Sequence, residues 1–319
     1  MLQSNKNKSI IEKVNWMILF TLIVFRYISS KLVKWLIATY HIKLTNVETF
    51  LISDFFIILI PLLFVLINRI NIFKFIQFKL LKPFDILLSI GMAFAMSPLM
   101  SIINWTSLLF FDLGTKAIAQ NSVDLPLWLQ LLIIAVGPGI IEELIFRGVT
   151  FHAYRPNGLL GAALYSAIFF ALAHGNMNQF LYTIFMGFVM ALEVEATGSI
   201  FASMITHFTL NGSSVLVQYG LKALQNSLPK PESTTVVLDE TLYFFGGVFA
   251  GQTLLMAVGG VVLAYIIFKT MLKRSGRTDY FTYQIYRGFG PQNNERFVTE
   301  PYIMAAGFIV LLMLNLALS

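Results

Sequence analysis

Nine long apolar stretches run through this sequence, and they restrict the chain to very few folds. Hydrophobic residues make up 57% of the chain and charged residues only 12%, whereas about 25% of a soluble domain is charged. About 20 consecutive apolar residues cross a bilayer as a helix, and a backbone in lipid must pair its own polar groups. We therefore predict an all-α fold, a polytopic transmembrane helical bundle of about eight to nine spans, with residues 1–319 as a single membrane domain. The stretches lie at about 14–40, 50–68, 84–111, 127–150, 159–174, 179–196, 199–220, 243–272 and 302–319.

Parts of this arrangement are less regular. The first stretch contains Arg26, Lys31 and Lys34, so we expect that its helix can leave the membrane early and continue along the membrane surface. Two polar connections, 221–241 and 273–301, exceed the usual loop length. Each is long enough to hold a short interfacial helix.

Lysine and arginine are distributed unevenly between the connecting segments, and this bias predicts the orientation of the chain. With the N-terminus in the cytoplasm, thirteen of these residues lie on the cytoplasmic side and four outside. The thirteen are Lys6, Lys8, Lys13, Arg69, Lys74, Lys79, Lys82, Arg155, Lys273, Arg274, Arg277, Arg287 and Arg296, and the four are Lys43, Lys116, Lys222 and Lys230. We predict a multi-pass protein of the cell membrane with a cytoplasmic N-terminus and, for an odd number of spans, an external C-terminus.

Charge and cysteine content narrow the possible partners. The net charge of +6 is spread over the cytoplasmic edges, so we interpret it as a topology signal and a contact with anionic lipid of the bilayer, not as a nucleic-acid site. The chain has no cysteine, which excludes disulfides, thiolate nucleophiles and Cys-ligated metals.

Ionisable residues inside the apolar stretches are concentrated in the fourth to the seventh. A charge in a membrane span is costly, so each such residue is a functional hypothesis. The residues concerned are Glu142, Glu143, Arg147, His174, Glu193, Glu195 and His207, joined by the amide Asn211.

The stretch "GPGIIEELIFRGVTF" places two adjacent glutamates on one predicted helix. Glu143 and Arg147 are four residues apart, in the favourable order for an ion pair on one helix face. Glu142 points about 100° away and has no such partner on its own helix. Pro138 is expected to kink the helix nearby. One glutamate is therefore predicted to be structural and the other available for chemistry.

Two histidines follow in neighbouring spans, each with a partner four residues away. Phe170 and His174 share a helix face in "FFALAH", and His207 and Asn211 share one in "HFTLN". The plainer alternative is that His174 caps a helix and that His207 bonds only to Asn211 or another helix.

These three elements resemble the motifs of a known family. "EELIFR" matches an EExxxR pattern, "FALAH" an FxxxH pattern and "HFTLN" an HxxxN pattern, in the order seen in the CPBP (CAAX protease and bacteriocin-processing, Abi) family, which is related to the Ras-converting CAAX endopeptidase. The stretch "TGSIFASMITHFTLN" resembles the family's approach to its third motif. The resemblance covers about residues 127–218, the expected catalytic core, and the outer spans share only hydropathy with it.

The resemblance implies an intramembrane glutamic endopeptidase. By this carry-over, Glu142 and His174 polarise the attacking water, and His207 and Asn211 form the oxyanion side. The supporting residues are Glu143 and Arg147, which hold the helix, and Phe170 of the second motif. Peptide hydrolysis by water does need a base and oxyanion donors. We expect no cofactor and no metal.

Other chemistries stay open. Glu142, His174 and His207 would make a His₂Glu zinc set, although the sequence has no HExxH helix and Asn211 would then lack a role. Ser203 and His207 could form a serine dyad, but serine on a membrane helix usually bonds its own backbone.

Functions other than proteolysis are also possible. A proton-coupled transporter could use intramembrane Glu and His as a relay, although paired inverted repeats are missing from the sequence. A bacteriocin-immunity or regulatory membrane protein is a further possibility. Glu193 and Glu195 lie on nearly opposite sides of their helix; we expect Glu195 at the membrane interface, and Glu193 lining the cavity or snorkelling.

The expected partner is a membrane-associated peptide or protein substrate. Abundant Ile, Lys and Asn are typical of an AT-rich bacterial genome, which favours a pheromone precursor or bacteriocin leader over a prenylated CAAX protein. The sequence does not indicate an oligomeric state.

Overall fold

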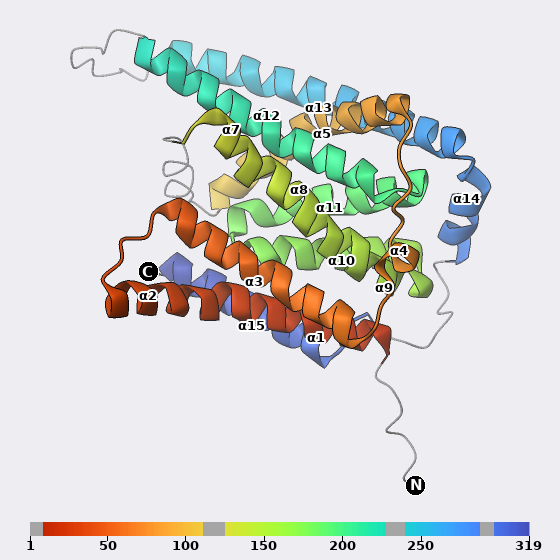
Figure 1. Cartoon of the computed structure of the whole chain (residues 1–319). Helices are drawn as coiled ribbons and strands as arrows, with labels where there is room; N and C mark the ends of the chain where they lie inside the picture. Colours follow the sequence, from red (N-terminus) through yellow and green to blue (C-terminus); the bar gives the residue numbers. More distant parts are fainter. Residues whose placement is uncertain (1–8, 111–124, 228–239, 288–296, 319) are drawn as a thin grey trace.

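Long helices account for nearly all of the structure. The computed structural model describes residues 9–110, 125–227, 240–287 and 297–318, and within them the helices pack side by side in one bundle (Figure 1). The predicted all-α transmembrane bundle is confirmed. The helix bounds, in chain order, are α1 Ile10–Ile23, η1 Val24–Ile28, α2 Ser29–Tyr40, α3 Asn46–Ile67, α4 Ile72–Phe75, α5 Pro83–Phe110, α7 Leu127–Gln130, η2 Leu131–Val136, α8 Gly137–Glu143, η3 Leu144–Phe151, α9 His152–Tyr154, η4 Arg155–Asn157, α10 Leu159–His174, α11 Met177–Thr197, α12 Ile200–Ser227, α13 Glu240–Ser275, α14 Thr278–Arg287 and α15 Glu300–Leu318.

Length and apolar composition identify the helices that can cross a membrane. Within the described residues, five are long and apolar enough, and three more are shorter apolar helices. The five are Pro83–Phe110, Leu127–Asn157, Met177–Thr197, Ile200–Leu224 and Gly251–Ser275, and the three are Phe55–Ile67, Leu159–His174 and Glu300–Met313. The chain is thus a multi-pass membrane protein, while eight to nine spans remains a prediction.

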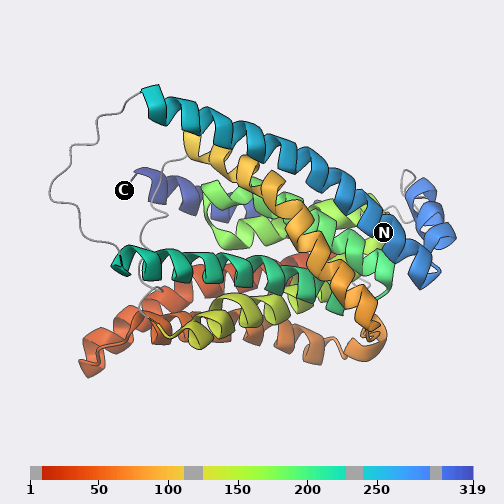
Figure 2. The same ribbon diagram turned by 90° about the horizontal axis from the view of Figure 1, so that it is seen from above.

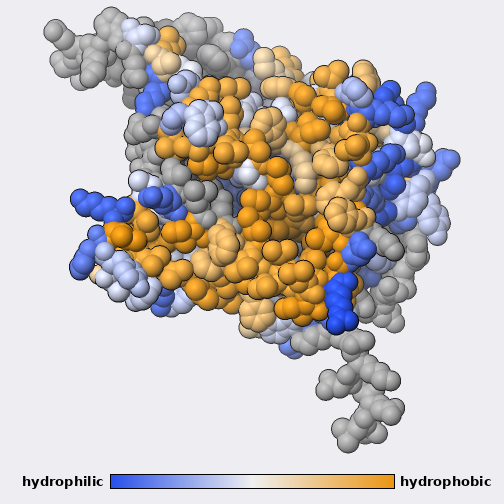
Figure 3. Space-filling view, in the orientation of Figure 1, coloured by the Kyte–Doolittle hydropathy of each residue, from blue (hydrophilic) through white to orange (hydrophobic). Residues whose placement is uncertain are grey.

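Apolar side chains form a broad band across the bundle, and hydrophilic residues gather at its two ends (Figure 3). Helices α4, α9 and α14 lie at one end, and the α2–α3 connection lies at the other (Figure 1). The predicted topology likewise places the segments around α4, α9 and α14 on one side of the membrane and the α2–α3 connection on the other. Which of the two ends faces the cytoplasm remains a prediction. Five of the charges used for the prediction lie outside the described residues: Lys6, Lys8, Lys116, Lys230 and Arg296.

The N-terminal helices show clear local signals at their ends. The Ser9 hydroxyl accepts from the Glu12 amide at the start of α1, and Thr45 forms a capping box with Glu48 at the start of α3. The first predicted span is helical through α1, η1 and α2, but no part of it is among the helices long and apolar enough to cross. This agrees with the charges in its second half.

Two tight turns set the central helices against each other. Gly175, with φ 60°, ends α10, and Gly198, with φ 70°, ends α11; both angles are left-handed, where glycine has no Cβ penalty. The turn at Gly198 is also tied to the chain before α5, because the Ile200 amide donates to the Gln77 carbonyl at 2.9 Å. The two turns align α10, α11 and α12, which carry the second and third motifs.

Helix α13 lies along α5 on one side of the bundle, away from α1 to α3 (Figure 2). The connection that follows α13 contains α14, so the segment 273–301 does hold a short helix. The first long connection, 221–241, begins inside α12, which continues to Ser227, and residues 228–239 lie outside the described part.

Gly260 makes the contact between α5 and α13 possible, and this generates a stability prediction. A Cβ built at Gly260 would lie 2.2 Å from the Ala95 carbonyl oxygen, whereas one at Gly259 meets nothing within 4 Å. Gly260→Ala should lower the free energy of unfolding by about 1–3 kcal/mol through overpacking. Thermal unfolding in detergent measures the effect.

Gly259→Ala is the matched control. It should leave the protein as stable or more so, since alanine is favoured over glycine in a helix by up to about 1 kcal/mol. Equal unfolding midpoints for the two variants would show that the α5–α13 contact is not tight at Gly260.

Candidate active site

The first motif lies on a helix whose hydrogen bonding is repeatedly altered. Residues Leu127–Asn157 run on as one long helix, but the segments η2 and η3 are π-helical and flank the α-helical turn α8. Pro138 at the start of α8 has no N–H, so it cannot pair with the carbonyl four residues earlier. Such π segments are frequent at functional sites.

The two adjacent glutamates lie in different environments, as their helical positions predict. The Glu143 side chain is fully buried, and the Glu142 side chain is 22% exposed. Oε1 of Glu143 accepts from Nη1 of Arg147 at 2.9 Å. The same oxygen lies 2.9 Å from Nδ1 of His207. Glu143 therefore joins the first motif to the third as well as pairing within its own helix.

His207 lies between the two carboxyl groups. Because the Glu143 contact uses Nδ1 and a carboxylate oxygen accepts, the neutral ring carries its hydrogen on Nδ1 and its lone pair on Nε2. Nε2 lies 3.9 Å from Oε2 of Glu142. That separation is too long for a direct hydrogen bond, but a water beside the line joining the two atoms could bond to both.

Phe170 packs among the charged and imidazole groups. The Arg147 guanidinium lies over its ring, 4.1 Å from the centroid. The rings of His174 and His207 meet it edge-on, with centroids 4.8 Å and 5.7 Å away. Nδ1 of His174 lies 2.8 Å from the Phe170 carbonyl oxygen, so this ring too carries its hydrogen on Nδ1. One aromatic side chain thus orients the second motif against the first and the third.

Asn211 bonds to the first-motif helix. Its Nδ2 donates to the Ile134 carbonyl at 3.0 Å. Ile134 is the residue whose α-helical partner would be the N–H of Pro138, so Asn211 supplies a donor that proline lacks. Asn211 shares a helix face with His207, and its second N–H remains chemically able to donate to another oxygen.

Close helix contacts around the site depend on two glycines, Gly139, beside Pro138, and Gly187, and the sequence reasoning passed over the second. A Cβ at Gly187 of α11 would lie 2.9 Å from Nη2 of Arg147 and 3.1 Å from Cδ1 of Phe170, and one at Gly139 would lie 3.4 Å from the Phe208 amide nitrogen. Glycine inside a helix costs about 1 kcal/mol relative to alanine. A glycine inside a predicted helix is therefore a sign, visible in the sequence, that the position is needed for close packing.

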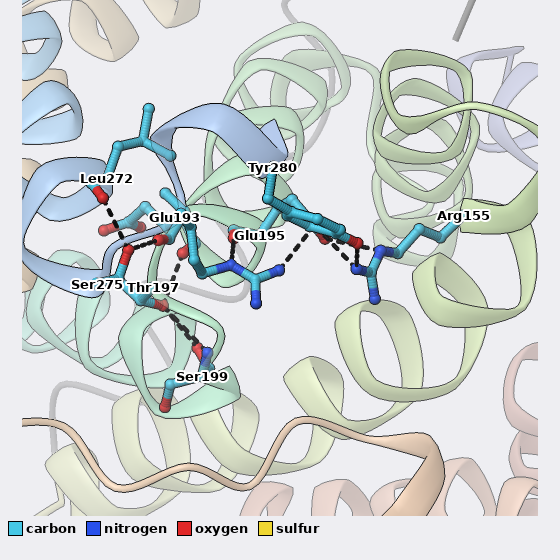
Figure 4. A network of polar contacts seen from close by, with 10 residues as sticks. Arg155, Glu193, Glu195, Thr197, Ser199, Leu272, Ser275 and Tyr280 are labelled. Carbon is cyan, nitrogen blue, oxygen red and sulfur yellow. Dashed lines mark hydrogen bonds and ion pairs between the residues drawn. The ribbon is translucent and has the colours of Figure 1, made fainter. Parts of the chain in front are cut away.

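The surroundings of Glu193 and Glu195 bear on only part of what the sequence predicts for them. Both side chains are fully buried, so Glu193 does not snorkel, while the place of Glu195 at the membrane interface remains a prediction. Figure 4 shows Glu195 beside Tyr280, with Arg155 approaching from the side of the tyrosine hydroxyl. The Glu195 carboxylate binds Arg155 and Arg277 at 2.9 Å. Buried charges are tolerated when paired, and here the paired residues come from outside the motifs.

Two of the alternative chemistries can be compared with this geometry. The Ser203 hydroxyl donates to the Ile200 carbonyl at 3.0 Å, which is the backbone bond expected of a helical serine. In the described part of the chain, no group of three or more His, Asp and Glu residues is arranged to hold a metal ion.

Comparison with known proteins supports the motif-based resemblance. Residues 124–213 match the family model described as "Type II CAAX prenyl endopeptidase Rce1-like". The chain is 32% identical over 137 residues to the "Putative membrane peptidase YdiL" of Bacillus subtilis (strain 168), covering 43% of this chain. The chain spans about half the length of that curated relative, 52%. No solved structure matches it.

The buried ion pair generates a stability prediction. Arg147→Ala leaves Glu143 in a buried site without its guanidinium, and breaking such a pair typically costs about 3–5 kcal/mol. Folding yield and the thermal midpoint in detergent should fall sharply. Adding Glu143→Gln should recover part of the loss, because the uncompensated charge is then removed.

A surface ion pair provides the control. Arg274 and Asp85 form a contact of 2.6 Å with side chains 35% and 16% exposed, and Arg274→Ala should cost about 1 kcal/mol or less. A double variant no more stable than Arg147→Ala alone would show that the two residues are not energetic partners.

Proposed function

From the match of residues 124–213 to the model of the Rce1-like family of type II CAAX prenyl endopeptidases, we propose that the chain is a membrane endopeptidase. Its reaction is the hydrolysis of a peptide bond in a membrane-associated peptide or protein. We further propose that the chemistry is of the glutamic type. The observation that carries this proposal is the 3.9 Å approach of Glu142 to Nε2 of His207, with Glu143 behind the imidazole.

Glu142 is the proposed base. It is the more exposed of the two glutamates, and the described residues place no arginine or lysine in an ion pair with it. His174 completes the water site by offering Nε2 as an acceptor or, when protonated, as a donor. Glu142 removes a proton from water, the hydroxide adds to the peptide carbonyl carbon, and the carbonyl oxygen becomes an oxyanion.

The oxyanion is proposed to accept hydrogen bonds from Asn211 and His207. Because Nδ1 of His207 is directed at Glu143, Nε2 donates only in the imidazolium form. Collapse of the tetrahedral intermediate breaks the C–N bond, and the proton held by Glu142 passes to the leaving nitrogen.

Glu143, Arg147 and Phe170 are proposed to position this machinery without contacting the substrate. Residues 127–218 remain our proposal for the catalytic core. Access from the bilayer is supported by a hollow in the apolar face between α3 and α8 (Figure 3). A peptide that lies in or on the membrane could reach the site from there. Within the proposed class, a bacterial pheromone precursor or bacteriocin leader remains our proposed substrate.

Glu142→Gln is the direct test of the glutamic mechanism. The amide cannot accept the proton of water, so cleavage of a membrane-inserted reporter peptide should fall at least about a thousandfold, given that general base catalysis and its oriented water are lost together. The thermal midpoint should stay near that of wild type because Glu142 is partly exposed. Activity within about threefold of wild type would refute the mechanism.

Metal content separates the glutamic mechanism from a zinc protease. Asn211→Ala removes one proposed oxyanion donor and should slow cleavage by about 10²–10³ without changing the metal content of the pure protein. Wild-type activity should survive exhaustive chelation. Stoichiometric zinc, with activity lost to the chelator and restored by the metal, would instead make His174 and His207 ligands.

A further inference from the structure

A second buried carboxyl group lies beside the candidate site and has no part in the proposed reaction. Oε1 of Glu193 on α11 lies 3.0 Å from the Thr206 hydroxyl oxygen on α12. The same hydroxyl oxygen lies 3.0 Å from the carbonyl oxygen of Ser89 on α5. All three residues are 0% exposed. The three helices therefore meet at one hydroxyl group.

Counting hydrogens at this junction indicates the state of the carboxyl group. The Thr206 hydroxyl has a single hydrogen. The Ser89 carbonyl oxygen and an ionised Glu193 would both be acceptors, so one of the two contacts would have no hydrogen. Both contacts are satisfied if Glu193 is a carboxylic acid that donates to Thr206 while Thr206 donates to Ser89.

The surroundings of Glu193 favour the same state. Among the described residues no lysine, arginine or histidine forms an ion pair with it, and its Oε2 is buried without a hydrogen-bond partner. Arg147 and Glu143 are close enough to act on it electrostatically, but Arg147 is bound to Glu143. An isolated buried carboxylate is very costly.

Glu195 provides the contrast, two residues further along α11. Its carboxylate is equally buried but binds the guanidinium group of Arg155 (Figure 4) and that of Arg277. Helix α11 thus carries two buried glutamates in different surroundings. Glu195 pairs with two guanidinium groups, whereas Glu193 contacts a threonine hydroxyl group.

We propose that Glu193 is a neutral carboxylic acid and a positioning residue for the candidate active site. Its chain of hydrogen bonds through Thr206 to Ser89 fixes the height and rotation of α12 against α5 and α11. Thr206 directly precedes His207, so the same restraint holds Nδ1 of His207 at Glu143 and Nε2 toward Glu142. The positioning role, but not the neutral state, rests on the proposed function.

Infrared spectroscopy of the purified full-length protein tests the protonation state without any substrate. The wild type should show the C=O stretch of a protonated, hydrogen-bonded carboxylic acid at neutral pH. Glu193→Gln should remove that band, and Glu195→Gln should leave it in place because the Glu195 carboxylate is paired with two guanidinium groups. If the Glu193→Gln spectrum keeps the full carboxylic acid intensity of wild type, the assignment is overturned.

Cleavage kinetics test the positioning role. Glu193→Gln should stay within about threefold of wild type, since its amide N–H can replace the acid as donor to Thr206. Glu193→Met keeps the length but has no donor, so kcat should fall about tenfold, which corresponds to one hydrogen bond. KM should change little, because Glu193 does not touch the substrate. Equal kcat values for the Met and Gln variants would overturn the role.

The outcomes remain separable from the proposed function. If wild type cleaves no peptide, the peptidase proposal fails, whereas the infrared difference still decides the state of Glu193. In that case the positioning role is decided by the distance between two spin labels, one on α5 and one on α12, measured by electron paramagnetic resonance. A change in this distance in Glu193→Met that is not seen in Glu193→Gln supports the positioning role. An unchanged distance in both variants overturns it.

Discussion

The buried pairing of Glu143 with Arg147 and His207 is the interaction on which the centre of this molecule depends. Both members of the ion pair are fully buried, and a membrane protein tolerates such charges only when each is compensated. His207 adds the restraint from a third side chain. The register of α12 against α8 and η3 is therefore set by a charge that must be satisfied, and the apolar packing accommodates it, including Gly187 beside Arg147.

Backbone hydrogen bonding is the second constraint, and it joins the same two helices. Proline at position 138 removes a donor from a helix in an environment that offers little water. Asn211 compensates at the Ile134 carbonyl. The third motif therefore contacts the first-motif helix in two ways. His207 bonds to the Glu143 carboxylate, and Asn211 bonds to the Ile134 carbonyl group that proline leaves without a donor. A residue proposed for oxyanion binding is held in place by a structural bond.

Four glutamates within this membrane core illustrate how environment separates identical side chains. Glu143 is paired with a guanidinium and an imidazole, and Glu195 with two guanidinium groups. Glu193 meets a threonine hydroxyl, and Glu142 is the one with partial exposure. Only a carboxyl group that is neither bound to a guanidinium group nor sealed from water is suited to exchange a proton with substrate water. This distinction, more than the presence of acidic residues, supports Glu142 as the base.

The sequence by itself determined the helical class, the apolar stretches and the contacts made within one helix. The Glu143–Arg147 pair and the shared face of Phe170 and His174 follow from a spacing of four residues. Tertiary structure alone decided the approach of His207 to Glu143, the bond of Asn211 to Ile134 and the burial of Glu193. These depend on the rotation and axial position of one helix relative to another. Hydropathy does not encode them, because lipid-facing and core-facing apolar residues look alike, and packing of small residues and satisfaction of buried polar groups select among the possible registers.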